Sequence, residues 1–285
     1  MNPAFWGVVS AFGWGTADFI ARSTGRAMGP RTALFGMLSV GAVVLTAIVW
    51  IGRLPLSLDP SGYGLLLVSG VGTMLGTLLL YRGLARGPLT VVAPIVGAYP
   101  ALNVVVNLVR GIHPSPPQWV AMIAVIAGVA VVALAAPQTE GPTESSRRHV
   151  RRSALIAVAA AVVFAATMTS FQDAMVIYGE LQTVMLARWI SLIAVSLLII
   201  GRGDMPRLPA KQAPSLLAQG LLDGGAYLSL LYGSHGEGVG IVVVVSSTFA
   251  AVTVFLARIL LREAMSLPQW GAIALIVGGV VVLSG

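Results

Sequence analysis

Long apolar stretches alternate with short polar breaks along the whole chain. Each stretch holds about 20 mostly apolar residues, which is the length that an α-helix needs to cross a hydrocarbon core of about 30 Å. Ten such segments can be read, at residues 5–22, 31–51, 62–81, 88–108, 117–136, 153–174, 182–201, 213–232, 239–259 and 267–284. The pattern predicts an all-α, polytopic membrane protein with ten transmembrane helices.

Composition supports this interpretation. Of the 285 residues, 57 % are hydrophobic and 9 % are charged, whereas about a quarter of the residues in soluble domains are charged. The chain has no cysteine, which excludes disulfides, thiolate metal sites and cysteine nucleophiles. The first residues, MNPAFWG, contain no lysine or arginine, so we expect the first helix to be retained rather than cleaved as a signal peptide.

The distribution of lysine and arginine predicts an orientation. With ten spans, thirteen basic residues fall in the loops on one side: Arg22, Arg26, Arg31, Arg82, Arg86, Arg147, Arg148, Arg151, Arg152, Arg202, Arg207, Lys211 and Arg262. The opposite loops hold Arg53 and Arg110, while Arg188 and Arg258 fall within helices. Because basic loops stay on the cytoplasmic side, both termini are expected on the opposite, periplasmic side. The net charge of +7 is then explained by short loops facing the lipid bilayer, and no nucleic-acid partner is expected.

The two halves of the chain share a register. At an offset of 151 residues, Tyr81 aligns with Tyr232, and the tripeptide PQW at 117–119 aligns with PQW at 268–270. Five spans in each half are an odd number, so the second copy enters the membrane from the opposite face. The sequence therefore predicts two inverted five-helix repeats, 1–136 and 153–285, the arrangement that many secondary transporters use for alternating access. A polar, basic linker at 137–152 joins them, and its RRHVRR run is interpreted as an anchor near anionic headgroups.

These features resemble the drug/metabolite transporter superfamily, of the EamA type. The resemblance rests on ten spans in two repeats, on the segment AFGWGTADF at 11–19, and on the PQW helix that closes each repeat. It implies a carrier of small metabolites in the bacterial inner membrane, with amino acids exported by many members, and a cavity lined by the first four helices of each repeat. Second repeats of this type often carry Gly-Glu near the end of their fourth helix. Arg262-Glu263 holds that place here, and Gly111-Ile112 holds it in the first repeat. Some eukaryotic members are described with cytosolic termini, the opposite of the orientation that the basic loops predict.

The segment VVAPIVGAYPALNVVV at 91–106 places two prolines inside the fourth predicted span. Proline removes a backbone donor and clashes with the preceding turn, so Pro94 and Pro100 are expected to break or kink this helix near mid-membrane. Broken backbone at that depth is tolerated when it is buried in protein or lines a wet cavity. A kink that serves packing alone is the alternative. The equivalent segment of the second half has Ser246, Ser247 and Thr248 at this depth instead.

Few acidic residues lie within the spans, and a carboxylate there is costly unless it is paired or hydrated. Asp223, near the middle of the eighth span, is the leading candidate for a proton carrier or for the partner of a substrate ammonium group. A structural carboxyl that joins two helices is the alternative. Asp18 lies four residues before Arg22 and is expected to pair with it. Asp173 and Arg188 are expected to pair with each other, or Arg188 to receive a substrate carboxylate.

Aromatic and polar side chains at helical spacing complete the predicted site, because a small amphipathic solute needs a few polar groups in an apolar pocket. Trp14 stands in mid-helix between two glycines, and Tyr99 and Asn103 share one helix face. The predicted substrate-binding residues are Trp14, Tyr81, Tyr99, Asn103, Thr169, Asp223, Tyr227 and Ser247. The predicted coupling or gating residues are Asp18, Pro94, Pro100, Arg188 and Asp223.

No enzymatic arrangement is visible in the sequence. The three histidines lack ligand spacing, and the serines lack a His and Asp partner set, so no catalytic residue, metal site or cofactor is predicted. We expect a gradient-driven secondary transporter, a monomer, that exports small metabolites, foremost neutral or aromatic amino acids. A multidrug or lipophilic-cation exporter is the closest alternative. A channel, or an intramembrane protease using Asp173 and Asp223, is weighed below it.

Overall fold

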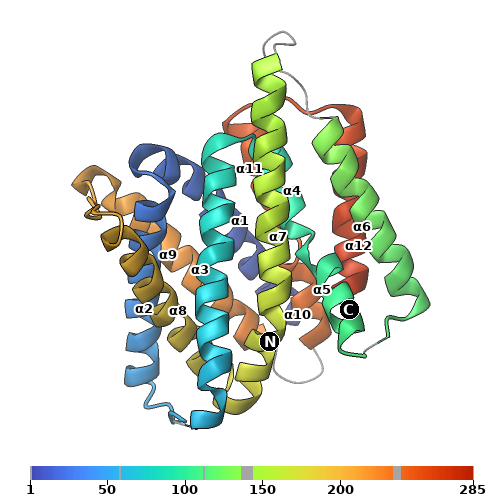
Figure 1. Cartoon of the computed structure of the whole chain (residues 1–285). Helices are drawn as coiled ribbons and strands as arrows, with labels where there is room; N and C mark the ends of the chain where they lie inside the picture. Colours follow the sequence, from blue (N-terminus) through green and yellow to red (C-terminus); the bar gives the residue numbers. More distant parts are fainter. Residues whose placement is uncertain (1, 58, 112, 136–143, 234–238, 285) are drawn as a thin grey trace.

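The structure is a computed structural model of the whole chain that describes residues 2–57, 59–111, 113–135, 144–233 and 239–284, and these residues form an all-helical protein (Figure 1). The first half contains α1 (Pro3–Met28), α2 (Pro30–Ile51), α3 (Tyr63–Arg86), α4 (Leu89–Gly97), α5 (Tyr99–Val109) and α6 (Pro116–Leu134). The second half contains α7 (Glu144–Tyr178), α8 (Glu180–Ile200), α9 (Ala213–Gly233), α10 (Val239–Ser246), α11 (Phe249–Leu260) and α12 (Leu267–Ser284). Short 3₁₀ turns, Pro60–Gly62 and Ala210–Gln212, precede α3 and α9.

Helices occupy all ten predicted segments. Within the described part of the chain, seven helical segments are long and apolar enough to cross a membrane, and α12 is a shorter apolar helix. The count of ten crossings therefore stays a prediction. Residues 137–143 of the predicted polar linker lie outside the described residues. α7 begins at Glu144, so the basic run before residue 153 is helical.

The fourth span of each half is divided into two helices. In the first half the break falls at Ala98, between α4 and α5, with Pro94 inside α4 and Pro100 at the start of α5. In the second half it falls at Ser247 and Thr248, between α10 and α11. The break predicted from the prolines is confirmed. Ser247 and Thr248 turn their hydroxyls back onto carbonyls of Val244 and Val245, at 2.6 and 2.7 Å, so the second break is made without proline.

The repeated PQW segment has a structural explanation. Gln118 accepts a hydrogen bond from the backbone N–H of Ser115 at 2.9 Å, and Gln269 accepts one from Ser266 N–H at 3.1 Å. Each glutamine thereby closes the capping box that begins the last helix of its half. The tryptophans that follow, Trp119 and Trp270, are 40 % and 44 % exposed on the outer surface, as expected of an aromatic belt.

Three pairs of helices form the most extensive packing across the boundary between the two halves. α3 packs on α7, the counterpart of α1, and α1 packs on α9, the counterpart of α3, while α6 packs on its own counterpart α12. In the last pair, Gly128 faces Ala272 and Ile276 while Gly279 faces Ala121 and Val125. The sequence positions run in opposite directions, so α6 and α12 are antiparallel. Glycines at these crossings let the backbones approach closely.

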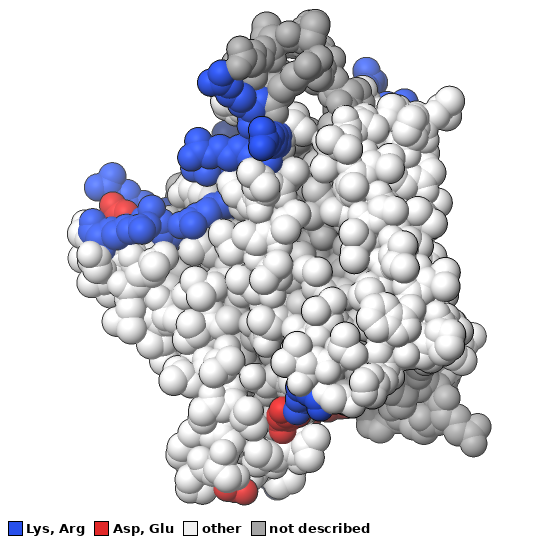
Figure 2. All heavy atoms as spheres, turned by 45° about the vertical axis from the view of Figure 1, so that its right-hand side comes forward, with Lys and Arg blue, Asp and Glu red and all other residues white. Residues whose placement is uncertain are grey.

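Most basic side chains lie at one end of the bundle. Figure 2 shows lysines and arginines gathered at the upper end, with few charges on the sides of the molecule. α1 begins and α12 ends in the lower half of Figure 1, away from this basic end. Large apolar side chains such as Trp50, Val176 and Leu134 are more than three-quarters exposed on the surface, which suits a surface that faces lipid rather than water.

Candidate functional site

A buried ion pair lies at the centre of the candidate site. The guanidinium of Arg188 on α8 pairs with the carboxylate of Asp223 on α9, and the two side chains are 6 % and 15 % exposed. The expected partner of Arg188 was Asp173, and that prediction is wrong. Asp173 instead pairs with Arg110 at 3.1 Å, because its face of α7 is turned toward the end of α5, whereas Arg188 faces α2 and α9.

Aromatic rings surround the ion pair on one side. The Arg188 guanidinium lies over the ring of Tyr227, 5.1 Å from its centroid, a distance that allows a cation–π interaction. Tyr227 meets Trp14 of α1 edge to face at 4.9 Å, and Trp14 meets Phe249 of α11 at 6.1 Å. The indole of Trp14 also reaches the Asp223 carboxylate. Trp14 therefore joins the ion pair to the break between α10 and α11.

A hydrogen-bonded group on α3, α9 and α1 adjoins the pair. Gln219 lies one turn before Asp223, and its side-chain NH₂ group donates to the hydroxyl of Tyr81. The Thr24 hydroxyl donates to the side-chain oxygen of Gln219, Oε1, at 3.1 Å. All three residues are at most 3 % exposed. Gln219 was not predicted from the sequence because a single glutamine in an apolar helix has no motif around it, although its spacing of four from Asp223 was available.

Asp18 belongs to the same interior region. It lies one turn after Trp14 on α1, and its carboxyl is close enough to that of Asp223 for the two to repel each other. The predicted pair between Asp18 and Arg22 is wrong. Arg22 extends away from Asp18 to Glu263. Among the described residues, this interior cluster therefore has two carboxyls, those of Asp18 and Asp223, and one guanidinium, that of Arg188.

The structure leaves open space beside the ion pair. Gly224 on α9 and Gly41 on α2 are both buried, yet a Cβ atom on either would have no heavy atom within 4 Å apart from its chain neighbours and the backbone of its own helix. Gly225, next along α9, also faces open space. Small residues with free volume around them, close to Asp223, can make room for a ligand.

The remaining predicted residues lie on neighbouring helices. Tyr99, at the start of α5, interacts electrostatically with Tyr227 and packs against Phe164 of α7 at 6.1 Å, so it borders the cluster. Asn103 and Thr169 lie on α5 and α7, which pack together. Each has a buried side-chain oxygen without a hydrogen-bond partner, which is unusual unless a ligand or water completes the site.

Comparison with known proteins decides the family. The model of the EamA-like transporter family matches the chain twice, over residues 1–134 and over residues 152–285. The chain belongs to the EamA-like transporter family. No curated protein matches it. Eighteen chains of solved structures match. One of them, described as "Crystal structure of protein", is 18 % identical with a TM-score of 0.64, and the match covers 98 % of this chain and 95 % of that one. At that identity the likeness shows the fold alone.

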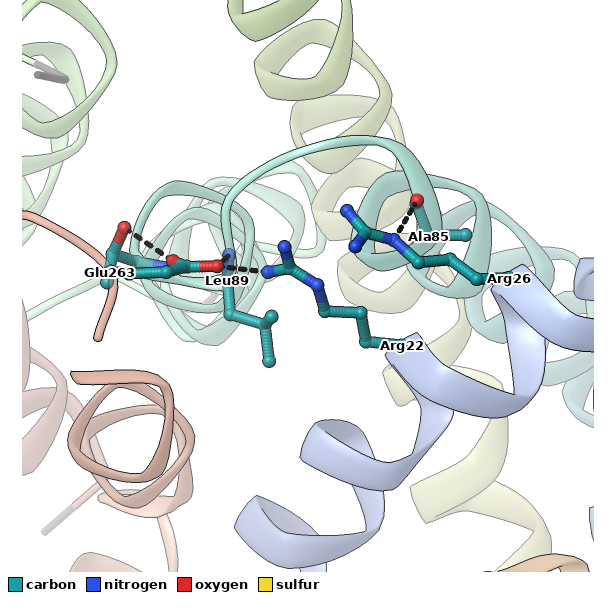
Figure 3. Close-up of polar contacts among 6 residues, drawn as sticks. Arg22, Arg26, Ala85, Leu89 and Glu263 are labelled. Atoms are coloured by element: carbon teal, nitrogen blue, oxygen red, sulfur yellow. Dashed lines mark hydrogen bonds and ion pairs between the residues drawn. The ribbon is translucent and has the colours of Figure 1, made fainter. Parts of the chain in front are cut away.

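In this EamA-like transporter, Glu263 joins the two halves at the basic end. Its carboxylate pairs with Arg22 of α1 and accepts hydrogen bonds from the backbone N–H groups of Leu89 and Thr90, at 3.2 and 3.1 Å (Figure 3). The Thr90 hydroxyl donates to the same carboxylate at 3.0 Å. A negative charge is favourable there, because the first N–H groups of α4 have no partner within the helix.

The residue before Glu263 has an unusual backbone conformation. Arg262 has φ 52°, and Gly111, its counterpart at the offset of 151, has φ 82°. Both follow the last turn of a helix, where a left-handed residue commonly ends the helix and is usually glycine. The first half therefore keeps the glycine of the Gly-Glu pattern, and the second half keeps the glutamate.

Proposed function

We propose that this transporter exports neutral and aromatic amino acids across the bacterial inner membrane, and that the substrate binds at the Arg188–Asp223 pair. The observation that carries the proposal is a buried ion pair bordered by aromatic rings and open space. A zwitterionic amino acid has one carboxylate and one ammonium group, which match the guanidinium of Arg188 and the carboxylate of Asp223.

Aromatic neighbours supply the rest of the proposed pocket. Trp14 and Tyr227 contact each other beside Arg188, and they would contact the substrate side chain, while the open space at Gly224 and Gly225 would admit it. Pockets of this type use a few polar groups for orientation and apolar walls for affinity. The unpartnered oxygens of Asn103 and Thr169 would bind further polar atoms or water.

We further propose ten crossings in two inverted repeats, with boundaries near 1–136 and 153–285. Support comes from the packing, since the first helix of each half packs on the third helix of the other half, in the pairs α1–α9 and α7–α3. Trp6 lies beside Gly233 while Gly13 lies beside Leu222 and Ala226, so α1 and α9 run antiparallel. An inverted duplication gives two mirror-related arrangements of similar energy, which is the basis of alternating access.

The proposed orientation places the basic end in the cytoplasm and both termini in the periplasm. At the basic end, the contacts of Glu263 with Arg22 and α4 hold the halves together. Substrate entry from that side would require these contacts to separate, while the breaks within the fourth span of each half would let short helices tilt. The transporter is proposed to act as a monomer.

Coupling to protons is assigned to Asp18. The interior cluster has one guanidinium for two carboxyls, and Asp18 is the carboxyl that has no ion pair among the described residues. A group whose charge is unbalanced in this way is suited to exchange a proton with each turnover. Asp223, paired with Arg188, is assigned to the substrate.

Transport by purified protein in liposomes tests these assignments. We expect uptake of labelled neutral and aromatic amino acids above that of empty liposomes, with stimulation by a pH gradient. An Asp18→Asn variant should keep downhill exchange and lose the stimulation. Stimulation that persists in this variant would refute the role of Asp18 without touching the substrate assignment.

A multidrug exporter is the second candidate, favoured by the aromatic contacts of Trp14 with Tyr227 and Phe249. Lipophilic cations in the same liposome assay distinguish the two candidate functions, because a multidrug exporter would transport these cations and would not transport amino acids. The intramembrane protease loses its basis, since Asp173 pairs with Arg110 at an exposed site while Asp223 pairs with Arg188 in the interior. A dyad of Asp173 and Asp223 would need these two carboxyls to lie together.

A further inference from the structure

A groove lined by arginines lies at the basic end, between α2, α3 and α7. It has a volume of about 410 Å³, and its lining consists of Pro30, Arg31, Leu79, Arg82, Arg86, Arg152 and Ile156. A second groove of about 400 Å³ shares Arg86 and Arg152 with the first and continues along α7. Figure 2 shows this region as part of the basic band at the upper end.

The charges in this groove are all of one sign. Arg82 is within electrostatic range of Arg31, Arg86 and Arg202, and each of these repels it. Of the arginines that line the groove, Arg31 has an acidic partner, Asp204 at 3.2 Å. Among the described residues, no carboxylate pairs with Arg82, Arg86 or Arg152. Like charges held this close destabilise the site unless an anion binds between them.

The groove also has apolar walls. Leu79 and Ile156 are half-buried and lie one turn from Arg82 and Arg152 on their own helices, away from the basic end. Leu75, one further turn along α3, and Leu155, beside Ile156 on α7, are exposed. A ligand seated among the arginines would therefore have an apolar path directly below it, along α3 and α7.

We propose that this groove binds an anionic phospholipid, with its phosphate group between Arg82, Arg86 and Arg152 and its acyl chains against α3 and α7. Guanidinium groups form bidentate hydrogen bonds with phosphate, and basic pockets between helices on the cytoplasmic side are suited to anionic headgroups. This site is more specific than the general attraction of a basic loop for a charged membrane. The apolar walls favour a lipid over a free phosphate, which shares the headgroup chemistry.

Native mass spectrometry of the protein in an uncharged detergent tests the proposal, with phosphatidylglycerol, phosphatidylcholine and glycerol 3-phosphate as the three probes. We expect phosphatidylglycerol to bind at least about tenfold more tightly than the other two. In the double variant Arg82→Gln/Arg152→Gln its affinity should fall about 25-fold, since one basic residue near the surface contributes roughly a factor of five.

The matched control is Arg207→Gln/Lys211→Gln, which removes two exposed charges from the same end but outside the groove. It should keep the affinity of the unmodified protein. Equal losses in both variants would show a diffuse charge effect and overturn the site, as would equal binding of phosphatidylcholine or of glycerol 3-phosphate. If Arg82→Gln/Arg152→Gln does not fold, Arg82→Lys/Arg152→Lys takes its place as the test variant. Loss of bidentate geometry should lower the affinity severalfold, and unchanged binding would contradict the proposal.

Discussion

The Arg188 guanidinium on α8 is held between the carboxylate of Asp223 and the ring of Tyr227, both on α9. A buried ion pair of this kind is weak evidence for stability, because removing two charges from water costs about as much as their attraction returns. Its position next to Trp14 and open space instead points to a role in binding.

The loss in the free energy of unfolding should therefore be larger when one partner of this pair is removed than when both are removed. Asp223→Asn leaves the buried Arg188 guanidinium without the carboxylate that pairs with it, and we expect it to lower the free energy of unfolding by about 3 kcal/mol. Arg188→Met/Asp223→Leu removes both charges and should restore most of that stability while transport stays absent. Thermal unfolding in detergent measures the stabilities.

The control is Asp173→Asn, which breaks the half-exposed pair with Arg110 and should cost at most about 1 kcal/mol. A double variant that is as unstable as Asp223→Asn would mean that the interior needs these charges for folding.

Glu263→Gln should raise the population of molecules that are open at the basic end. The glutamine keeps the shape but loses the charge that binds Arg22 and the first N–H groups of α4. Charge-assisted bonds are roughly twice as strong as neutral ones, and a loss of about 1.4 kcal/mol raises the open population tenfold. Because the chain has no cysteine, a Thr24→Cys reporter can measure this opening by its rate of maleimide labelling.

Thr24 lies on α1, two residues after Arg22, and is fully buried. Its labelling rate should rise about tenfold with Glu263→Gln and stay unchanged with Glu180→Gln, an exposed glutamate at the start of α8. Equal rates in the two backgrounds would show that Glu263 does not close this end.

Replacement of Arg262 by glycine should stabilise the protein. A left-handed conformation costs a non-glycine residue about 1–2 kcal/mol, part of which is offset because glycine loses more backbone entropy on folding. Arg262→Gly is expected to raise the unfolding free energy by up to about 1 kcal/mol, and Gly111→Ala, at φ 82°, to lower it by a similar amount. Thermal unfolding of the two variants measures both changes, and a lower stability of Arg262→Gly would indicate that its side chain has a role of its own.

Single-cysteine variants test the predicted orientation of the protein in the membrane. His113, between α5 and α6, and Arg207, between α8 and α9, are exposed. The two connections lie at opposite ends of the bundle (Figure 1). In intact cells, a membrane-impermeant maleimide should label His113→Cys and leave Arg207→Cys unlabelled until the cells are opened. The reverse result would place the basic loops outside and refute the predicted orientation of the termini.

The helices could be predicted from the sequence because apolar length and polar breaks are local properties. The break at Ala98 followed from Pro94 and Pro100 for the same reason. The ion pairs could not be predicted, because they depend on which helix faces which. Arg188 was matched with Asp173 on the adjacent helix, whereas the fold turns it toward Asp223 on α9. Arg22 was matched with Asp18 one turn away, whereas Glu263 lies 241 positions along the chain from Arg22.

Counterflow in proteoliposomes tests the central claim most directly. Vesicles loaded with an unlabelled aromatic amino acid should transiently accumulate the labelled one when they contain the unmodified protein, and should fail to do so with Asp223→Asn, while Asp173→Asn behaves like the unmodified protein. Counterflow that is undiminished in Asp223→Asn, or absent from the unmodified protein for every neutral and aromatic amino acid, would contradict the proposal that this pair binds an exported amino acid.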